Sequence, residues 1–461
     1  MKTIVIVGAG FSGTALAVNL LRMATPGSVQ LVLVNRSGAQ ARGVAYGTRS
    51  AKHILNVPAG NMSALPDHPG HFLEFCARTD PLVRPESFVS RERYGSYLAW
   101  LLDQSALGKQ HYLTRIEAEV DAITPTASAA GAPRWRVQLG GARVVFADEV
   151  VLAVGNFPPR NFPVPNQAFY DSRRYIRDPW SPGALDSIPS DAGVLLLGTG
   201  LTAIDVANVL ARADGRRKCY AISRRGLLPQ PHRCIRPGRA PEAGDDLRRA
   251  MGSDVRTYVR AIRATIRHAR ETGADWRDVL GALRAHTPSL WACLSLKEKR
   301  RFLRHVQPFW DVHRHRLAPE AHLYFHGALH AGDIALIRAR VLDYQAFEQG
   351  IQVTIRRRGV AEPEALSVEY VVNCTGPTSD LRAIDDPLFA QLRSDGLLRS
   401  DALGLGLEVD DRYQCLGHTL APVDGLRYLG PLLKARYWEA TAVPELRVHA
   451  QALARELLAD T

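Results

Sequence analysis

Cysteine is scarce in this sequence, and long apolar runs are missing. The six cysteines among 461 residues form no CxxC pair and no Cys/His cluster with the spacing of a zinc or iron–sulfur site. Enzymes that work through a redox-active disulfide need two neighbouring cysteines, so this class is disfavoured. No stretch approaches the roughly 20 apolar residues that span a bilayer, and no signal-peptide cleavage site follows the N-terminus. We therefore expect a cytoplasmic protein with free thiols, no metal site and no membrane partner.

Lysine is also scarce, although the chain is basic. Only seven of its 58 lysines and arginines are lysine, and the formal net charge is +12. The arginines are spread along amphipathic segments instead of forming one basic tail, so we expect no nucleic-acid partner. Such a charge suits small anions or nucleotide phosphates. The sequence leaves the oligomeric state open.

A dinucleotide-binding fingerprint follows the first predicted strand. The β-branched run at 3–7 leads into a GxGxxG loop and an apolar helix, and a second strand follows at 29–34. Such a loop lets backbone N–H groups and the helix N-terminus approach a pyrophosphate. The second strand ends in an amide and a cation, where an acid usually binds the ribose, and an amide still hydrogen-bonds a hydroxyl. The candidate cofactor-binding residues are Gly8, Gly10, Phe11, Ser12, Gly13, Asn35 and Arg36.

A second fingerprint lies almost two hundred residues further on. The apolar strand at 193–197 runs into a Gly-Thr-Gly loop in which Ala203 replaces the third glycine, and the next strand, at 218–222, ends in Ser-Arg-Arg. Arginine at that point suits a 2′-phosphate and favours NADP over NAD. Solvated surface arginines are the alternative interpretation. The candidate residues are Gly198, Gly200, Thr202, Ala203, Ser223, Arg224 and Arg225.

Two dinucleotide sites in one chain imply electron transfer between two cofactors, FAD at the first and NADPH at the second. Two more apolar strands close on glycines, Gly155 and Gly376, and they are typical of crossovers between such domains. We predict an α/β fold with two Rossmann-like dinucleotide-binding domains and a helical insertion. The FAD domain would comprise 1–180 and 370–461, and the NADPH domain 181–369 with a helical cap at about 240–320.

The helical cap is predicted from its periodicity. Apolar residues recur at helical spacing from Val255 to Ile266, and Ser295 with Glu298 forms a capping-box pattern. The cap covers the nucleotide or substrate region, or else it is a solvated decoration. His313 and His315 suggest a metal site, but no carboxylate or cysteine stands nearby at ligand spacing, so we predict no metal.

Several segments resemble the flavin-containing monooxygenase superfamily and, more closely, a bacterial group known only as FAD/NAD(P)-binding proteins. The resemblance spans almost the whole chain, and its most specific segments are 43–48, 53–67, 88–98 and 310–319. It implies that Asn56 contacts the flavin edge and the nicotinamide, with Asn61 as the alternative. It further places Tyr46, Met62, Ser63 and Gly430 among the cofactor-binding residues. The role of the 310–319 motif stays open.

The resemblance also implies a reaction. NADPH would reduce FAD, O₂ would form a flavin C4a-hydroperoxide, and one oxygen atom would pass to a small-molecule substrate. We expect N-hydroxylation of a small amine or amino acid. The alternatives are Baeyer–Villiger or related oxidation of a ketone or small metabolite, an NADPH-dependent flavin reductase or oxidase, and a non-catalytic flavin-binding partner protein.

Overall fold

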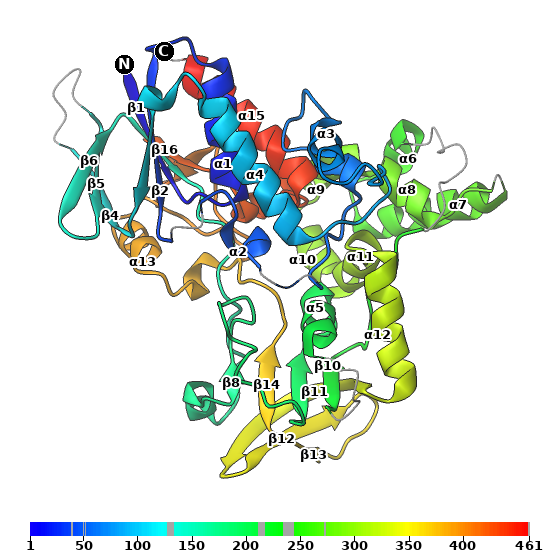
Figure 1. The fold of residues 1–461 in the computed structure, drawn as a ribbon. Coiled ribbons are helices and arrows are strands. Elements are labelled where there is room, and N and C mark those ends of the chain that lie inside the picture. The colour runs from blue at the N-terminus through cyan, green and yellow to red at the C-terminus, as the bar shows by residue number, and fades with distance from the viewer. Residues whose placement is uncertain are drawn as a thin grey trace.

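Two mixed sheets, each with a parallel part and an antiparallel edge, organise the computed structural model, one in its upper and one in its lower half (Figure 1). The structure describes residues 1–37, 40–48, 50, 52–126, 133–210, 217–233, 244–271 and 273–459. The predicted α/β class, with two Rossmann-like domains and a helical insertion, is confirmed. None of the described helices combines the length and the apolar composition needed to cross a membrane.

The upper sheet has six strands in the order β15-β16-β7-β1-β2-β3. The apolar, mostly β-branched residues 4–7 and 150–152 in its central strands are buried, as expected for parallel strands covered on both faces. Helices α1, α4 and α15 lie side by side over one face (Figure 1). The bounds are β1 Lys2–Val7, α1 Phe11–Met23, β2 Val29–Asn35, α4 Arg91–Ala106, β3 Leu113–Glu117, β7 Glu149–Leu152, β15 Gln414–Leu416, β16 Pro422–Tyr428 and α15 Val443–Ala459.

Shorter elements complete this half. An antiparallel three-stranded sheet contacts the upper sheet through β6 and the helix α13 through β4. The helices α2, α3 and α14 lie in the connections. The bounds are α2 Gly43–Tyr46, α3 His71–Ala77, β4 Val120–Pro125, β5 Trp135–Leu139, β6 Arg143–Ala147, α13 Pro387–Ser394 and α14 Lys434–Tyr437.

The lower sheet has seven strands in the order β13-β12-β11-β10-β9-β14-β8. Its parallel part carries the second glycine loop, between β9 and α5, and α5 packs against α12. The bounds are β8 Tyr175–Ile176, β9 Val194–Leu197, α5 Leu201–Leu210, β10 Cys219–Ser223, α12 Pro319–Ala331, β11 Ile334–Phe347, β12 Gly350–Arg357, β13 Glu364–Val368 and β14 Tyr370–Asn373.

Strand pairing bears on the predicted domain boundaries. Strands β8 and β14 lie inside the segments that we assigned to the FAD domain, yet β14 pairs with β9 and with β8 in the lower sheet. These pairings satisfy the backbone N–H and C=O groups of both strands. The two crossovers between the sheets meet where Phe157 and Thr378 form an antiparallel bridge. We therefore propose boundaries close to this bridge.

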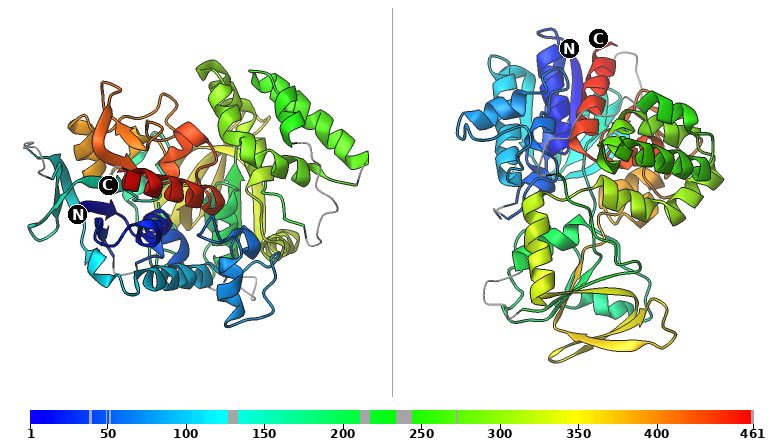
Figure 2. Two further views of the ribbon diagram at one scale, coloured as in Figure 1. Left: turned by 90° about the horizontal axis from the view of Figure 1, so that it is seen from above. Right: turned by 90° about the vertical axis from the view of Figure 1, so that its right-hand side faces the viewer.

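Six further helices form the insertion, on the right of Figure 1 and apart from the lower sheet in Figure 2. Val255 and Tyr258 are buried in its core, together with Trp438 from the C-terminal part of the upper half. The Ser295 hydroxyl accepts the Glu298 N–H as predicted, but the Glu298 carboxylate accepts the Val255 N–H instead of closing the capping box. The bounds are α6 Gly244–Ala250, α7 Val255–Glu271, α8 Trp276–Ala282, α9 Thr287–Cys293, α10 Leu296–His305 and α11 Gln307–Arg314.

Candidate active site

The first glycine loop fits a pyrophosphate. Gly8 has φ 104°, and a Cβ there would lie 2.5 Å from the Ala153 carbonyl oxygen. A Cβ at Gly13 would lie 1.9 Å from the Gly8 carbonyl oxygen, so the loop and α1 approach as closely as backbone allows. At the N-terminus of α1, Gly10 provides no side-chain cap and the described first turn holds no acidic residue. Its free N–H groups suit the phosphates of FAD. Phe11 and Ser12 are buried in this first turn.

Asn35 connects this loop to the end of β2. Its Oδ1 accepts the Ala9 N–H at 3.2 Å, and its amide nitrogen donates to the Ser37 carbonyl. Arg36, the next residue, is exposed. Asn35 therefore supports the loop from the position where an acid usually binds the ribose, and its contact with the ribose stays a prediction.

The second loop is open where a ligand would approach. Gly198 has φ 117°, and a Cβ there would lie 2.7 Å from the Cys374 carbonyl oxygen. In contrast, a Cβ at Gly200 would meet no described atom within 4 Å. Ala203 is fully buried at the place of the third glycine, whereas Thr202 is half-buried. The N-terminus of α5 thus has room for a second pyrophosphate.

The Ser-Arg-Arg turn after β10 divides its three side chains between different roles. Ser223 Oγ accepts the Gly226 N–H at 2.9 Å and so holds the turn. Arg225 donates to the Arg304 carbonyl of α10 at 3.0 Å, which directs its guanidinium toward the helical insertion. Arg224 is exposed and is the better candidate for a 2′-phosphate.

A third arginine, missed in the sequence, lies beside this turn. Arg338 of β11 is in register with Ser223 of β10, and a Cβ at Gly226 would lie 2.4 Å from Arg338 Cγ. More than a hundred residues separate the two strands in the chain, so only their pairing brings this guanidinium to the turn. Together with Arg224 it makes the end of β10 strongly basic.

Asn56 lies where the two halves of the molecule meet. Its backbone carbonyl accepts the Nε2–H of His232, from the segment after β10, at 3.0 Å. Phe88 packs on the same imidazole, with ring centroids 5.1 Å apart. Burial and the nearby Arg316 lower the pKa of His232 to about 4, so the ring is neutral near pH 7. The exposed Asn61 is the weaker candidate.

A buried ion pair joins the two halves close to Asn56. Arg91, at the start of α4, lies 2.5 Å from the Asp205 carboxylate on α5, and the two side chains are 14% and 9% exposed. Its guanidinium also lies 5.1 Å from the centre of the Trp180 ring. The pair holds α5, and with it the second glycine loop, toward the loop that carries Asn56. Arg91 lies in the 88–98 segment and Asp205 follows the second glycine loop, but neither pattern indicates that the two side chains pair.

The remaining predicted cofactor residues line the loops around this junction. Tyr46 packs against Tyr94, with ring centroids 4.6 Å apart, and Met62 is buried. Ser63 is also buried, and its hydroxyl donates to the His68 carbonyl at 2.7 Å, so this side chain holds its own loop. Any contact of Ser63 with a cofactor would involve its backbone.

The three other glycines mark chain reversals beside the sheets. Gly155 and Gly376 have φ 78° and 88°, and a Cβ at either would meet no described atom within 4 Å. Gly430 follows β16 and accepts the Leu433 N–H at 3.0 Å. Their cofactor contacts remain predictions, and the open space at the two crossovers is consistent with them.

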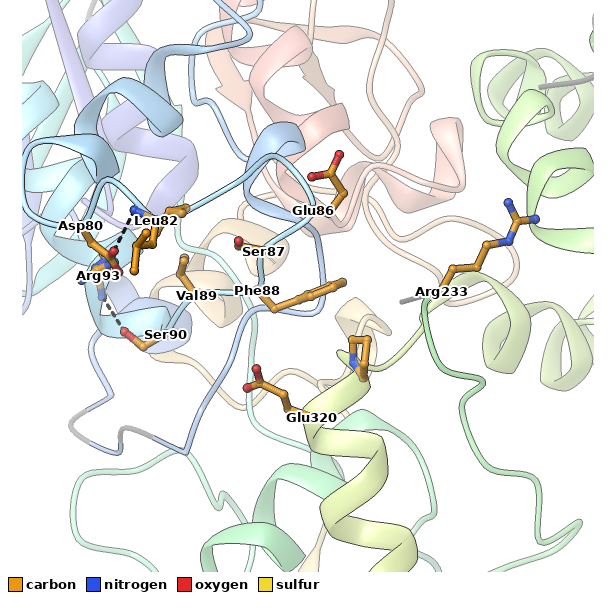
Figure 3. Close-up of a pocket in the computed structure, with 12 residues that line it drawn as sticks. Asp80, Leu82, Glu86, Ser87, Phe88, Val89, Ser90, Arg93, Arg233 and Glu320 are labelled. Atoms are coloured by element: carbon orange, nitrogen blue, oxygen red, sulfur yellow. Dashed lines mark hydrogen bonds and ion pairs between the residues drawn. The ribbon is translucent and has the colours of Figure 1, made fainter. Parts of the chain in front are cut away.

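A pocket of about 620 Å³ lies next to the Asn56–His232 contact. Figure 3 shows Phe88 from the loop before α4 and Glu320 from α12 on its walls, with Arg233 across from them. Asp80, on the same loop, is paired with Arg93 at 3.2 Å. Phe88 also packs on His232, so this side chain connects the pocket wall with the Asn56–His232 contact.

The 310–319 motif joins the insertion to the C-terminal part of the upper half. Trp310 Nε1 donates to Glu439 Oε1 at 2.9 Å, and Arg314 Nε lies 2.9 Å from Glu439 Oε2. The Glu439 side chain is 3% exposed, so this is a desolvated contact. Within the described part of the chain, no group of three or more His, Cys, Asp or Glu residues is arranged to hold a metal ion. The motif is therefore a docking element.

Comparison with known proteins agrees with this geometry. Residues 5–157 match a family model described as FAD-NAD(P)-binding. An L-aspartate N-monooxygenase (nitrosuccinate-forming) of Streptomyces davaonensis is 25% identical over 268 residues, which are 49% of this chain and 41% of that protein. The matched region thus spans less than half of the relative.

Solved structures show the same fold over the full length. An ornithine N-hydroxylase of Kutzneria sp. 744, with reduced FAD, NADP+ and L-ornithine, has a TM-score of 0.63 at 16% identity and full coverage of both chains. The reduced ornithine hydroxylase of Pseudomonas aeruginosa has a TM-score of 0.65 at 16% identity, covering 100% of this chain and 99% of its own. The L-lysine 6-monooxygenase of Pseudomonas syringae has a TM-score of 0.62 at 16% identity, covering 99% of each chain.

These findings confirm the resemblance to flavin-dependent monooxygenases at the level of the fold, and the family model supports the predicted dinucleotide site within residues 5–157. The family match covers the first glycine loop, Asn35 and Asn56, and the structural matches cover both dinucleotide-binding domains. Residues 5–157 therefore match an FAD-NAD(P)-binding family model, and the whole chain has the fold of these solved hydroxylase structures.

Proposed function

We propose that this protein is an FAD- and NADPH-dependent monooxygenase that N-hydroxylates a small amine or amino acid. The observation that carries this proposal is the position of Asn56. Its loop belongs to the FAD-binding half, and its carbonyl accepts a hydrogen bond from His232 of the other half. Between two cofactors bound at the two glycine loops, a group at this junction would contact both the flavin edge and the nicotinamide, as this reaction needs.

The relatives support the type of reaction. The curated relative is an aspartate N-monooxygenase, and the matched structures include ornithine and lysine hydroxylases. Each of these names gives an amino acid as the compound that is oxidised. None of the observations on this chain favours a ketone substrate.

Each half of the chain has a defined task in this proposal. FAD, when bound, supplies the redox and oxygen chemistry, and the α1 N-terminus with Gly8, Gly10 and Gly13 holds its pyrophosphate. The α5 N-terminus and Arg224 hold NADPH. The Arg91–Asp205 pair keeps the second half in a fixed position against the first. The neutral His232 holds the Asn56 loop by its Nε2–H.

A flavin reductase or oxidase needs the same two cofactor sites and no amine, so product analysis separates it from the proposed enzyme. FAD-loaded protein is reduced anaerobically with NADPH or NADH and then mixed with oxygenated buffer and a panel of amino acids and amines. We expect faster reduction by NADPH and one N-hydroxylated product per NADPH for the correct substrate. Hydrogen peroxide equal to the NADPH consumed, whichever amine is offered, would indicate a reductase or oxidase.

A matched pair of variants tests the role of Asn56. Asn56→Ala should lower the yield of hydroxylated product per NADPH at least tenfold, while FAD content stays constant. Asn61→Ala changes the same residue type on the same loop, at an exposed position, and should behave like the wild type. Equal behaviour of the two variants would remove Asn56 from the reaction. Failure of NADPH to reduce the bound flavin would instead indicate a non-catalytic flavin-binding protein.

A further inference from the structure

Arg316 is a half-buried cation without a partner. It follows α11 in the 310–319 motif, and no described residue accepts a hydrogen bond from its guanidinium or forms an ion pair with it. Its Nε is fully buried and unsatisfied. The centre of the Trp276 ring lies 5.9 Å from its guanidinium carbon. A buried guanidinium N–H without an acceptor is unfavourable, so the Nε favours a ligand that brings an acceptor to this side chain.

The charges around Arg316 further disfavour a guanidinium without an anion. Burial, Arg314, Arg277 and Arg233 lower the pKa of Arg316 to about 10, because each neighbouring cation opposes its charge. Asp275 alone acts in the opposite sense, and its effect is the smallest of those acting on Arg316. The group still carries its proton at pH 7. The result is a local excess of positive charge inside the protein.

The carboxylates nearby are already used by the other arginines. Arg233 binds Asp275 and Asp278, with contacts of 3.1 and 2.9 Å. Arg277 binds Asp275 at 3.0 Å and also donates to the Pro231 carbonyl. Arg314 pairs with Glu439 and lies 3.5 Å from Glu445, which also binds Arg284. Arg316 alone among the four clustered arginines lacks an anion.

The position of Arg316 connects it to the proposed reaction centre. Its neighbour Leu317 forms a parallel bridge with Pro231, and the His232 N–H donates to the Leu317 carbonyl at 2.9 Å. His232 in turn donates to the Asn56 carbonyl. Arg316 is also the charged group with the largest effect on His232. Arg316 is therefore connected to Asn56 through its chain neighbour Leu317 and through His232.

We propose that Arg316 binds a carboxylate of the substrate and that the enzyme selects a net-anionic amino acid, a dicarboxylic one in particular, over diamines and amides. This inference rests on the proposed function for the reaction itself. A guanidinium binds a carboxylate through two parallel hydrogen bonds, which fixes orientation as well as affinity. The same excess of positive charge repels a second ammonium group, so cationic diamino compounds are poor substrates.

A binding experiment tests this without turnover. Succinate is a dicarboxylate without an amine, and it is titrated by calorimetry into the FAD-loaded protein saturated with NADP+. We expect succinate to bind and succinamide not to bind. Arg316→Gln should weaken succinate binding at least tenfold, Arg316→Lys should weaken it less, and Arg260→Gln on the exposed face of α7 should leave it unchanged.

The outcomes separate the sources of the anion. Loss of succinate binding when NADP+ is added, with a raised Kd for NADP+ in Arg316→Gln, would assign the guanidinium to a cofactor phosphate and overturn the proposal. Equal binding of succinate and succinamide to the wild type would also overturn it. This comparison uses only the wild-type protein, so it does not depend on whether a variant folds.

Kinetics then connect the site to the reaction. With aspartate, Arg316→Gln should raise KM at least tenfold and leave the rate of flavin reduction by NADPH within twofold. The preference for aspartate over asparagine should disappear in this variant. If the wild type binds succinate through Arg316 but hydroxylates no amine, the proposed function fails while the carboxylate site stands.

Discussion

The two glycine loops are supported in different ways. The first loop is held by its own domain, through the close approach of Gly8 to Ala153 and the hydrogen bond from the Ala9 N–H to Asn35. The second also has a close approach within its own domain, of Gly198 to Cys374. It is positioned in addition by other parts of the molecule, because Arg225 binds the insertion and Asp205 binds Arg91 of the upper half. Binding of the first cofactor is therefore a local property. Binding of the second, and its distance from the first, depends on contacts between domains.

The largest expected difference between the loops concerns folding. Gly13→Ala places a Cβ 1.9 Å from the Gly8 carbonyl oxygen, whereas the Cβ of Gly200→Ala meets no described atom within 4 Å. We expect Gly13→Ala to lose about 3 kcal/mol of unfolding free energy and most of its FAD. Gly200→Ala should keep the wild-type unfolding free energy and FAD content and raise the KM for NADPH. Urea unfolding and flavin absorbance measure the first pair of effects. A stable, FAD-loaded Gly13→Ala protein would contradict the described loop.

Removing the inter-domain ion pair should affect the second site and spare the first. Asp205→Asn leaves the Arg91 guanidinium, 14% exposed, without its carboxylate. The expected cost is about 3 kcal/mol of unfolding free energy. Flavin reduction by NADPH should slow at least tenfold, while the FAD content stays constant. Stopped-flow reduction measures the rate, and the double variant Arg91→Met with Asp205→Leu should recover the stability but not the rate.

Acid should weaken the contact between the domains through His53. This side chain is 7% exposed and packs on Trp180, and burial and Arg91 lower its pKa to about 4. The unfolded histidine, with a pKa near 6.5, binds its proton first as the pH falls. Its contribution to stability is therefore full above about pH 6.5 and lost toward pH 4, by up to about 3 kcal/mol.

Two histidine variants test whether His53 causes this pH dependence of the unfolding free energy. His53→Gln cannot titrate, so the fall in unfolding free energy between pH 6.5 and pH 4 should be smaller than in the wild type. His268→Gln, on the exposed surface of α7, should leave the slope unchanged. Urea titrations at several pH values measure both. A slope that is the same in His53→Gln and the wild type would mean that other groups cause it.

The smallest expected effects are at the second cofactor turn. Arg224 is exposed, whereas Arg225 is bound to the Arg304 carbonyl and lies 5.7 Å from the centre of the Phe309 ring. Arg224→Gln should raise the KM for NADPH about tenfold and leave that for NADH unchanged, a loss of roughly 1.4 kcal/mol. Arg225→Gln should change either value less than threefold. Steady-state kinetics with both cofactors decide between these residues.

Elements with local signals were predictable. The β-branched run of β1, the glycines of both loops and the apolar periodicity of α7 each depend on neighbours within about ten residues, and all of them form as expected. The FAD- and NADP-binding fold followed from these patterns. Of the predicted capping box at Ser295, the hydrogen bond to the Ser295 hydroxyl forms, but the one to the Glu298 carboxylate does not, because Glu298 contacts α7 instead. A local sequence pattern indicates which hydrogen bonds are possible. It does not indicate whether a donor on a distant helix will bind the same acceptor.

The contacts at the junction were not predictable. His232 binds the Asn56 carbonyl across 176 residues of chain, and Arg91 binds Asp205 across 114. Arg338 reaches Ser223 only through the pairing of β10 with β11. In so arginine-rich a chain, a single arginine gives no signal of its own. The packing of the domains decides which guanidiniums are paired, which are exposed and which are buried without an acceptor.

By itself, the sequence determined that this chain has two dinucleotide-binding loops, because a glycine loop between a strand and a helix specifies its own geometry through backbone sterics. The tertiary structure decided how the two sites face each other. It placed Asn56 against His232, joined α5 to Arg91 and left Arg316 without an anion. The physical reason is range: φ/ψ preferences and hydrophobic periodicity act over one turn or strand, whereas desolvation and charge pairing depend on every element packed around a group.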